Sequence, residues 1–416
     1  MQAQEPIVVT PENTEPDTTQ SWRDIMQPWW KAALSILPIF LLTRFLFLLL
    51  AYVGGVLFTP DAFSSVSYHD LLANWNRGDV TTYIAIAANG YTKPEQTLLF
   101  PLYPALMRTF APLFGHSMLT SGFFLSNLAF LGVLIVLYRL VETEFDTNTA
   151  QRTTLYLAIF PTAFVFFIAY SDALFLLFLL LAFYTMRHGF WWLAGLFGAL
   201  ATLTQFAGIF LFVAFLCEFA RQQGPQIRQD TRPLAQRVRP AIHALASLLI
   251  PLALTLYFTG LRTLFHSPFV AIQTQAQYSA GISSLFTALK TLVRQPHFSV
   301  IVVHNLLELT AFGMFIIVML LCFFGPERLA KSQWTFGVFG LLLLLSALLF
   351  SGSTGADSTL YEPLALLPRL VVSIFPAFIV LARLGRRTWF HQSYLLLAMP
   401  MLAFFVLQFI TGHWAV

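Results

Sequence analysis

The carboxylate whose surroundings best suit a general base is Asp79, in the segment 75–79 (WNRGD). Between apolar helices and a tryptophan-rich loop, a carboxylate is partly desolvated, and this makes it a stronger acceptor for a proton. Arg77, two residues earlier, favours the ionised form of the carboxylate. Asp is also a preferred N-cap, so Asp79 can instead begin a helix near Val80. The two roles are compatible, and Asp79 is the predicted catalytic residue.

Four more polar residues stand beside apolar runs, where helix ends are expected. Tyr170 and Asp172 fall between two such runs, and Gln205 falls in the next turn on the same predicted side. Helix capping and turn hydrogen bonds explain these residues as well as a substrate site does. Arg369 follows Pro368 at a predicted helix start. Its planar, permanently charged guanidinium suits either a lipid-linked phosphate or an anchor among headgroups.

Two ionisable residues four positions apart, His304 and Glu308, share one face of a predicted helix. An ionisable group inside a membrane span is costly and is a functional hypothesis by default, so both are candidate binding residues. Such a pair can also bind a divalent ion, but two ligands are too few to define a metal site. A hydrogen bond within the protein explains the pair more simply. No cofactor is therefore predicted, and a divalent cation stays open. Arg44, inside the first predicted helix, falls under the same rule.

Other signatures of chemistry are absent from the sequence. It has no glycine-rich phosphate loop, no HExxH, no paired CxxC and no GxSxG in a suitable context. The two cysteines, Cys217 and Cys322, lie in apolar runs and are interpreted as small core residues rather than as disulfide partners or metal ligands. These absences argue against nucleotide hydrolysis.

The elements that must position these residues are membrane helices. Of the 416 residues 57% are hydrophobic and 10% charged, and the mean hydropathy is +0.72; a soluble protein carries about 25% charged residues. The apolar runs are too long and uniform for barrel strands, so the predicted class is an all-α polytopic membrane protein. About eleven spans are predicted, near 32–58, 118–140, 153–170, 173–186, 190–204, 206–220, 241–260, 299–324, 334–350, 369–383 and 393–413. The segment 100–116 is interpreted as interfacial or re-entrant, and 190–220 as a short hairpin or one long helix.

The distribution of basic residues predicts the orientation. Residues 1–25 are polar and form a predicted disordered cytoplasmic tail, with 26–416 as one membrane domain. This orientation places most Lys and Arg residues in cytoplasmic loops, as the positive-inside rule expects. The net charge of +4 is thereby explained without nucleic acid. The outer segments are then 59–117, the largest, with 261–298 and 351–368.

The motifs, taken in order, resemble the PIG-V-type mannosyltransferases of the GT-C superfamily, and the chain is interpreted as a prokaryotic member. The resemblance covers about residues 70–380. Eukaryotic members of that family add the second mannose in glycosylphosphatidylinositol assembly. The motifs are Trp75-Asn76-Arg77-Gly78-Asp79, Tyr83-Ile84-Ala85-Ile86-Ala87, Asn89-Gly90-Tyr91, Phe100-Pro101-Leu102-Tyr103-Pro104, Ser126-Asn127-Leu128, Phe160-Pro161-Thr162-Ala163, Tyr170-Ser171-Asp172-Ala173-Leu174-Phe175, Trp191-Trp192-Leu193-Ala194-Gly195, Leu367-Pro368-Arg369 and Phe375-Pro376.

The resemblance implies a reaction. A polyprenyl-phosphate sugar, with mannose expected, would donate to a hydroxyl of a lipid or glycolipid acceptor at the outer face of a bacterial or archaeal plasma membrane. Asp79 would take the hydroxyl proton, and the anomeric carbon would be inverted. Arg369, assisted by Arg77 or His304, would stabilise the leaving phosphate. The aromatic residues expected to bound the sugar are Trp75, Tyr83 and Tyr91.

The sequence departs from the family pattern in two places, and two rival functions stay open. Asp79 stands between Gly78 and Val80 where the family has Trp-Asp or Asp-Ala, and Gln205 stands where Arg is usual, which leaves one substrate contact unassigned. The family's Ser-Glu is Ser171-Asp172 here, with the charge retained. The main rival is a secondary transporter or flippase, for which inverted repeats and ionisable residues at the bilayer midplane are expected. The other is a non-enzymatic assembly subunit, for which an inert Asp79 is expected. The polar candidates gather instead at the outer boundary, which favours an enzyme.

Overall fold

All the regular secondary structure in the described part of the chain is helical. The computed structural model describes residues 22–58, 68–228, 234–278, 300–325, 327–349 and 367–412, with 283, 286, 289 and 290. The predicted all-α polytopic class is confirmed, and the chain is an integral membrane protein. The predicted cytoplasmic tail 1–25 lies outside the described residues as far as residue 21, and the first helix begins at Trp22.

The helices differ widely in length. They are α1 (Trp22–Phe58), α2 (Tyr68–Ala73), α3 (Asp79–Asn89), α4 (Leu102–Phe110), α5 (Met118–Glu144), α6 (Thr147–Ala158), α7 (Asp172–Arg187), α8 (Trp191–Thr204), α9 (Leu211–Arg228), α10 (Leu234–Leu245), α11 (Leu249–Phe265), α12 (Val270–Tyr278), α14 (Val300–Phe323), α15 (Trp334–Leu349), α16 (Leu367–Val371), α17 (Phe375–Leu384) and α18 (Thr388–Thr411). Short 3-10 turns lie between them, namely η1 (Pro94–Leu98), η2 (Ala111–Phe114), η3 (Ala163–Phe166), η4 (Phe206–Phe210), η5 (Ala246–Leu248) and η6 (Lys331–Gln333).

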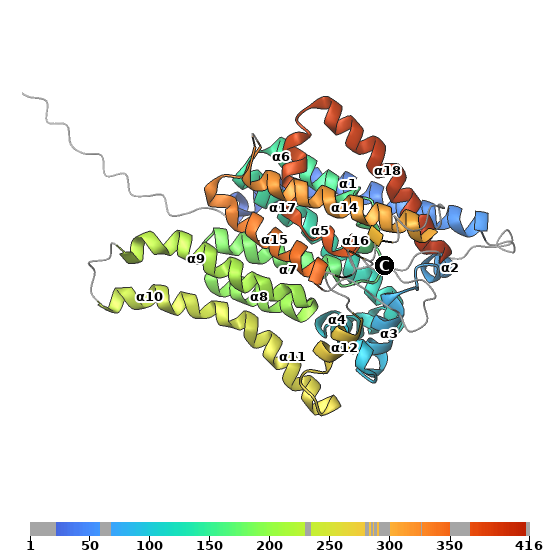
Figure 1. The fold of residues 1–416 in the computed structure, drawn as a ribbon, viewed down its shortest axis with the longest axis horizontal. Helices are drawn as coiled ribbons and strands as arrows, with labels where there is room; N and C mark the ends of the chain where they lie inside the picture. Colours follow the sequence, from blue (N-terminus) through green and yellow to red (C-terminus); the bar gives the residue numbers. More distant parts are fainter. Residues whose placement is uncertain are drawn as a thin grey trace, which may run out of the picture.

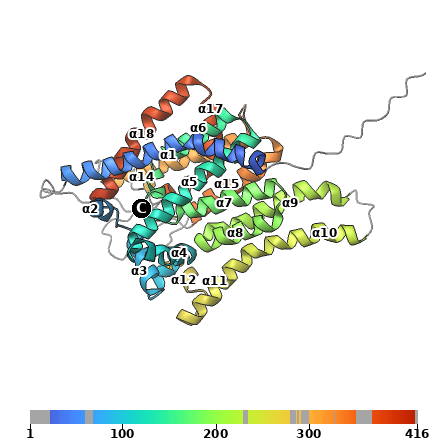
Figure 2. The same cartoon turned by 180° about the vertical axis from the view of Figure 1, so that it is seen from behind.

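The long helices form a bundle with two distinct ends. The short helices α2, α3, α4 and α12 gather at one end, and the last residues of α9 and the first of α10 lie at the other (Figures 1 and 2). Helix α7 packs between α5 and α8 inside the bundle. It is apolar on all sides and mostly buried, as expected for a central helix. Helices α1 and α18 pack together and leave large apolar side chains such as Leu42, Phe45 and Leu396 exposed, which suits contact with lipid.

The number of spans stays a prediction. Within the described residues six helical stretches are long and apolar enough to cross a bilayer: Met26–Val56, Met118–Glu144, Phe206–Gly224, Pro240–Phe265, Lys331–Leu349 and Thr388–Thr411. The shorter apolar helices are Trp191–Thr204, Leu309–Phe323 and Phe375–Leu384. The segment 100–116 contains only α4 and η2. Nine α-helical residues extend about 14 Å, too short for a bilayer core of about 30 Å, which agrees with its exclusion from the predicted spans.

Two predicted helices are wrong, and proline explains both. The predicted helix 153–170 ends at Ala158, and the chain then runs to Ser171 with only the 3-10 turn η3. Pro161 has no N–H to donate and disfavours helical backbone in the residue before it. The predicted helix 369–383 is likewise divided into α16 and α17, and Pro376 stands in the first turn of α17. These two breaks place Tyr170 and Arg369 on short, non-continuous segments.

The ambiguous run 190–220 is a hairpin. Helix α8 ends at Thr204, and Gln205 has an extended backbone (φ −150°, ψ 146°) before η4 begins. Gly208 makes the turn tight, because a Cβ on it would lie 2.4 Å from the backbone nitrogen of Thr202. This turn brings Gln205 to the start of α7.

Candidate active site

Three charged side chains from distant parts of the chain form one row at the end of the bundle. The Arg369 Nε donates to both oxygens of Asp172, at 2.9 and 2.7 Å, and its Nη1 donates to Asp79 Oδ2 at 2.5 Å. The side chains are 1% exposed for Asp172, 8% for Arg369 and 36% for Asp79. One guanidinium thus balances two carboxylates, and only the Asp79 end of the row is open enough to receive a substrate.

Aromatic and polar neighbours fix this row in place. The Arg369 guanidinium carbon lies 4.5 Å from the centroid of the Tyr170 ring, a cation–π distance. The Tyr170 hydroxyl accepts a hydrogen bond of 3.3 Å from the backbone N–H of Asp79. Gln205 Nε2 donates to Asp172 Oδ1 at 3.1 Å. The predicted site residues Asp79, Tyr170, Asp172, Gln205 and Arg369 are therefore brought together.

Helix starts position both carboxylates, although neither acts as a cap. Gly78 is the N-cap of α3, with φ 56° and ψ −135°, and Asp79 is the first helical residue. No side-chain cap bond forms at this helix or at α7, where Ser171 is the N-cap and Asp172 begins the helix. The positive ends of the two helix dipoles favour carboxylates at these positions. The capping alternative for Asp79 is wrong, because Gly78 is the N-cap and the Asp79 side chain makes no capping bond; its carboxylate binds Arg369 instead.

Tyr83 supports the row through Ser171, the residue before Asp172. Its ring is buried and packs edge-on against Tyr103 at 4.9 Å, and its hydroxyl donates to Ser171 Oγ at 2.7 Å. Burial raises the pKa of Tyr83 to about 12, so the phenol keeps its proton for this bond. Gln205 Nε2 donates to the same Ser171 oxygen at 3.3 Å. The position of Tyr83 suits a supporting role more than contact with a sugar.

Two of the aromatic residues that were expected to bound the sugar lie away from the row. Trp75 is fully buried, and its ring centroid lies 5.1 Å from that of Phe167 and 6.0 Å from that of Phe409. A ring covered by protein cannot stack on a sugar, so this prediction is corrected to a packing role. Tyr91 donates to the Leu99 carbonyl at 2.7 Å and faces Tyr257 at 6.3 Å, which places it in a separate small core.

The predicted partner of Asp79 is also corrected. Arg77 is exposed, and its Nη1 lies beside Gly412, where a Cβ would be 2.4 Å away. It therefore sits at the end of α18, where a cation meets the negative end of the helix dipole. Arg369, 290 residues from Asp79, takes the place expected for Arg77.

The His304 and Glu308 predictions are not tested. Both lie within helix α14, but their side chains lie outside the described residues. Among the described side chains no three His, Cys, Asp or Glu residues come close enough to hold a metal ion. A divalent cation therefore stays an open prediction.

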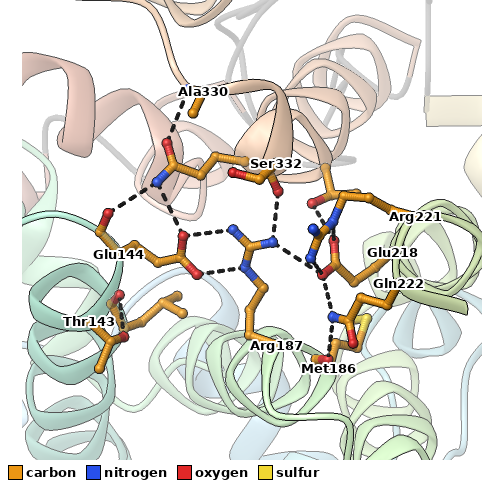
Figure 3. Close-up of polar contacts among 12 residues, drawn as sticks. Thr143, Glu144, Met186, Arg187, Glu218, Arg221, Gln222, Ala330 and Ser332 are labelled. Atoms are coloured by element: carbon orange, nitrogen blue, oxygen red, sulfur yellow. Dashed lines mark hydrogen bonds and ion pairs between the residues drawn. The ribbon is translucent and has the colours of Figure 1, made fainter. Parts of the chain in front are cut away.

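A second charged cluster, at the opposite end of α7, was not predicted from the sequence (Figure 3). Arg187 Nε and Nη2 donate to the two oxygens of Glu144, each at 2.7 Å, and Nη1 donates to Glu218 at 3.1 Å. Glu218 is fully buried and also accepts from Arg221 and Thr335. Because every carboxylate oxygen in this cluster accepts a hydrogen bond, we interpret it as a joint between α5, α7, α9 and α15.

Comparison with known proteins gives one match to a family. Residues 93–232, about a third of the chain, match the family model described as dolichyl-phosphate-mannose-protein mannosyltransferase. This confirms, for that part of the chain, the predicted resemblance to GT-C mannosyltransferases. The closer resemblance to PIG-V-type enzymes stays a prediction. No curated protein matches the sequence.

Several solved structures are similar to this protein. ArnT from Cupriavidus metallidurans bound to undecaprenyl phosphate shares 16% identity, with a TM-score of 0.48, over 83% of this chain and 59% of that one. The apo oligosaccharyltransferase of Archaeoglobus fulgidus shares 12% identity, with a TM-score of 0.44, over 90% and 56%. The A. fulgidus AglB complex with an inhibitory peptide and a dolichol-phosphate shares 12%, with a TM-score of 0.40, over 94% and 56%. This chain thus spans less than two thirds of the length of each.

Proposed function

We propose that this protein is a membrane glycosyltransferase that moves a sugar, mannose by resemblance, from a polyprenyl-phosphate donor to a hydroxyl of a lipid or glycolipid. The observation that carries the proposal is the row Asp79–Arg369–Asp172, which is buried at Asp172 and open at Asp79. The family match over residues 93–232 supports the same class of reaction. We further propose that this end of the bundle faces the outside of the cell, because the basic residues favour that orientation.

The proposed reaction uses Asp79 as the base. The acceptor hydroxyl approaches its exposed side, because Oδ2 is already held by Arg369. The hydroxyl proton passes to the carboxylate while the acceptor oxygen bonds to the anomeric carbon from the face opposite the phosphate. The bond between that carbon and the phosphate oxygen breaks, and the polyprenyl phosphate leaves with the electron pair. The anomeric carbon is therefore inverted.

Arg369 is placed to link the two halves of this step. Before the reaction its charge is shared between Asp79 and Asp172. Once Asp79 is protonated, its attraction for the guanidinium falls, and Arg369 can turn part of its charge to the leaving phosphate. Asp172 keeps the guanidinium in place throughout, since it holds Nε through both of its oxygens.

The transporter alternative is less well supported. An intramembrane transport site is expected near the bilayer midplane, between interrupted helices. Here the charged row lies where α3 and α7 begin, at the end of the bundle away from the Glu144–Arg187 pair. That position suits a substrate taken from one leaflet and its aqueous boundary.

The test is a transfer assay on the full-length protein in lipid vesicles. Labelled polyprenyl-phosphate mannose is supplied with a lipid extract of the host, and the labelled products are identified by mass spectrometry. We expect the label to move from the donor to a new lipid, with free polyprenyl phosphate released. Movement of the intact labelled donor across the bilayer, with no bond cleaved for this or other polyprenyl-phosphate hexoses, would support a flippase instead.

A further inference from the structure

The segment from Ile159 to Ser171 poses a problem for a protein in a membrane. It is mostly non-helical, yet its residues are buried almost throughout. In the bilayer core no water is present to satisfy free backbone carbonyls, so non-helical backbone there needs donors from the protein. This segment leads directly into Tyr170, Ser171 and Asp172, and its conformation therefore sets the position of the proposed active site.

Three carbonyls of this segment accept hydrogen bonds from side chains of other helices. The Phe166 carbonyl accepts from Arg44 Nη1 at 3.3 Å, and the Phe167 carbonyl accepts from Asn127 Nδ2 at 3.0 Å. The Tyr170 carbonyl accepts from the hydroxyl of Ser126 at 2.9 Å. The donors come from α1 and α5, which pack against each other. The motif Ser126-Asn127, noted in the sequence without a role, supplies two of them.

Arg44 and Asn127 also bind each other, through Nη1 and Oδ1 at 2.8 Å. Asn127 Nδ2 is shared between the Phe167 carbonyl and that of Phe123, one turn earlier on α5, at 2.8 Å. Arg44 has no acidic partner among the described side chains, and its Nε and Nη2 make no hydrogen bond there. An arginine kept in a membrane helix without a carboxylate partner needs another reason to be there.

Aromatic rings provide the rest of the environment of Arg44. Its guanidinium carbon lies 4.6 Å from the centroid of Phe130, 5.3 Å from Phe47 and 5.6 Å from Phe167. Cation–π contacts of this kind lower the cost of a buried cation. The ring centroid of Phe167 also lies 5.1 Å from that of Trp75, so this ring connects the surroundings of Arg44 with the loop before Asp79.

We propose that Arg44 and Asn127 form a clamp on the segment 159–171. They are positioning residues that hold this segment so that Tyr170 and Asp172 contact Arg369. They act through the backbone and do not touch the substrate. The kinetic part of this inference rests on the proposed function, whereas the structural part does not. The clamp joins Arg44 of α1 to Asn127 of α5, which lie 83 residues apart in the sequence, and both bind the segment before the site.

Two variants separate positioning from general stability. Arg44→Met removes the donor to Phe166 together with a buried charge that has no acidic partner among the described side chains, so the desolvation cost of the charge is removed along with the hydrogen bond. Asn127→Asp gives Arg44 a carboxylate partner but removes the donor to Phe167. Thr43→Ala is the matched control. Thr43 is buried beside Arg44, but its hydroxyl donates only to Ile39 and Phe40 of its own helix.

The experiment compares hydrogen exchange and transfer kinetics in these variants. We expect amide exchange in 159–171 to rise about tenfold in Arg44→Met and Asn127→Asp, with α5 beyond Phe130 unchanged and the melting temperature changed little. The kcat should fall about tenfold or more, because a misplacement of about 1 Å is costly, while KM for the donor changes less. Thr43→Ala should match the wild type in both measurements.

Unchanged exchange in 159–171, or faster exchange spread evenly over the whole chain, would overturn the inference. If Arg44→Met does not fold, Asn127→Asp decides alone, since it retains Arg44 and gives its charge a carboxylate partner. If the wild-type protein transfers no sugar from any donor, the proposed function fails. The exchange pattern then still tests the clamp by itself.

Discussion

At the residue scale, the proposed chemistry depends on one buried cation that is shared between two unequal carboxylates. Asp172 is almost fully enclosed and holds Arg369 through two hydrogen bonds, whereas Asp79 is partly exposed and holds it through one. Breaking a buried pair by removing one partner costs about 3–5 kcal/mol, since the other charge stays buried and unpaired. The inner pair therefore fixes the arginine, and the outer carboxylate keeps the freedom that a base needs.

Asp172→Asn tests the inner pair. The variant leaves Arg369 buried with only Asp79 as a partner, so we expect a lower melting temperature in detergent. Combining it with Arg369→Met removes the unpaired charge as well, and the double variant should be no less stable than Asp172→Asn alone. Additive losses in the double variant would mean that the two residues do not stabilise each other.

Which residues gather in the charged row was largely predictable, but their contacts were not. Asp79, Asp172, Gln205 and Arg369 could be selected because each stands where an apolar run begins or ends. The ion pairs join residues 197 and 290 positions apart, and one sequence carries no signal for such contacts. The exposed Arg77 was wrongly preferred as the partner of Asp79 because proximity in sequence was the only guide.

At the element scale, short and interrupted helices determine where the site lies. Hydropathy located the long helices such as α5 well, because burial in lipid depends on composition. It failed for 159–170, which is more apolar than the helix α6 before it and yet is mostly non-helical. Only Pro161 signalled the break, and the donors that make it tolerable, such as Arg44, come from elsewhere in the chain.

The tight turn between α8 and η4 gives a prediction at this scale. Gly208→Ala would place a Cβ 2.4 Å from the backbone of Thr202, so the turn must open and draw Gln205 away from Asp172. We expect a lower melting temperature and lower transfer activity. Gly260→Ala is the control, because no atom lies within 4 Å of its added Cβ and alanine favours a helix by up to about 1 kcal/mol. Equal effects of the two variants would contradict the packing argument.

At the scale of the whole molecule, the two charged clusters lie at opposite ends of α7 and differ in their proposed roles. The Asp172 end is open at Asp79, whereas the Arg187 end is fully hydrogen-bonded and joins four helices. We infer that the second cluster stabilises the bundle and leaves the chemistry to the first.

Arg187→Met tests this division. It leaves Glu144 and the fully buried Glu218 without their shared cation, so we expect a large fall in melting temperature. In the protein that stays folded, KM for the donor should equal that of the wild type. Glu327→Gln is the control, because its pair with Arg383 is more exposed and such pairs contribute about 0–1 kcal/mol. A changed KM with an unchanged melting temperature would place the second cluster in the substrate path instead.

The most direct test of the whole account is sugar transfer by Asp79→Asn, in vesicles, from labelled polyprenyl-phosphate mannose. Glu95→Gln serves as the control, since it removes an exposed carboxylate from the same outer segment. We predict that Asp79→Asn folds and inserts normally but loses transfer by about 100-fold or more, as expected when a general base is removed, while Glu95→Gln transfers at the wild-type rate. Wild-type transfer by Asp79→Asn would contradict the assignment of the base and the mechanism built on it.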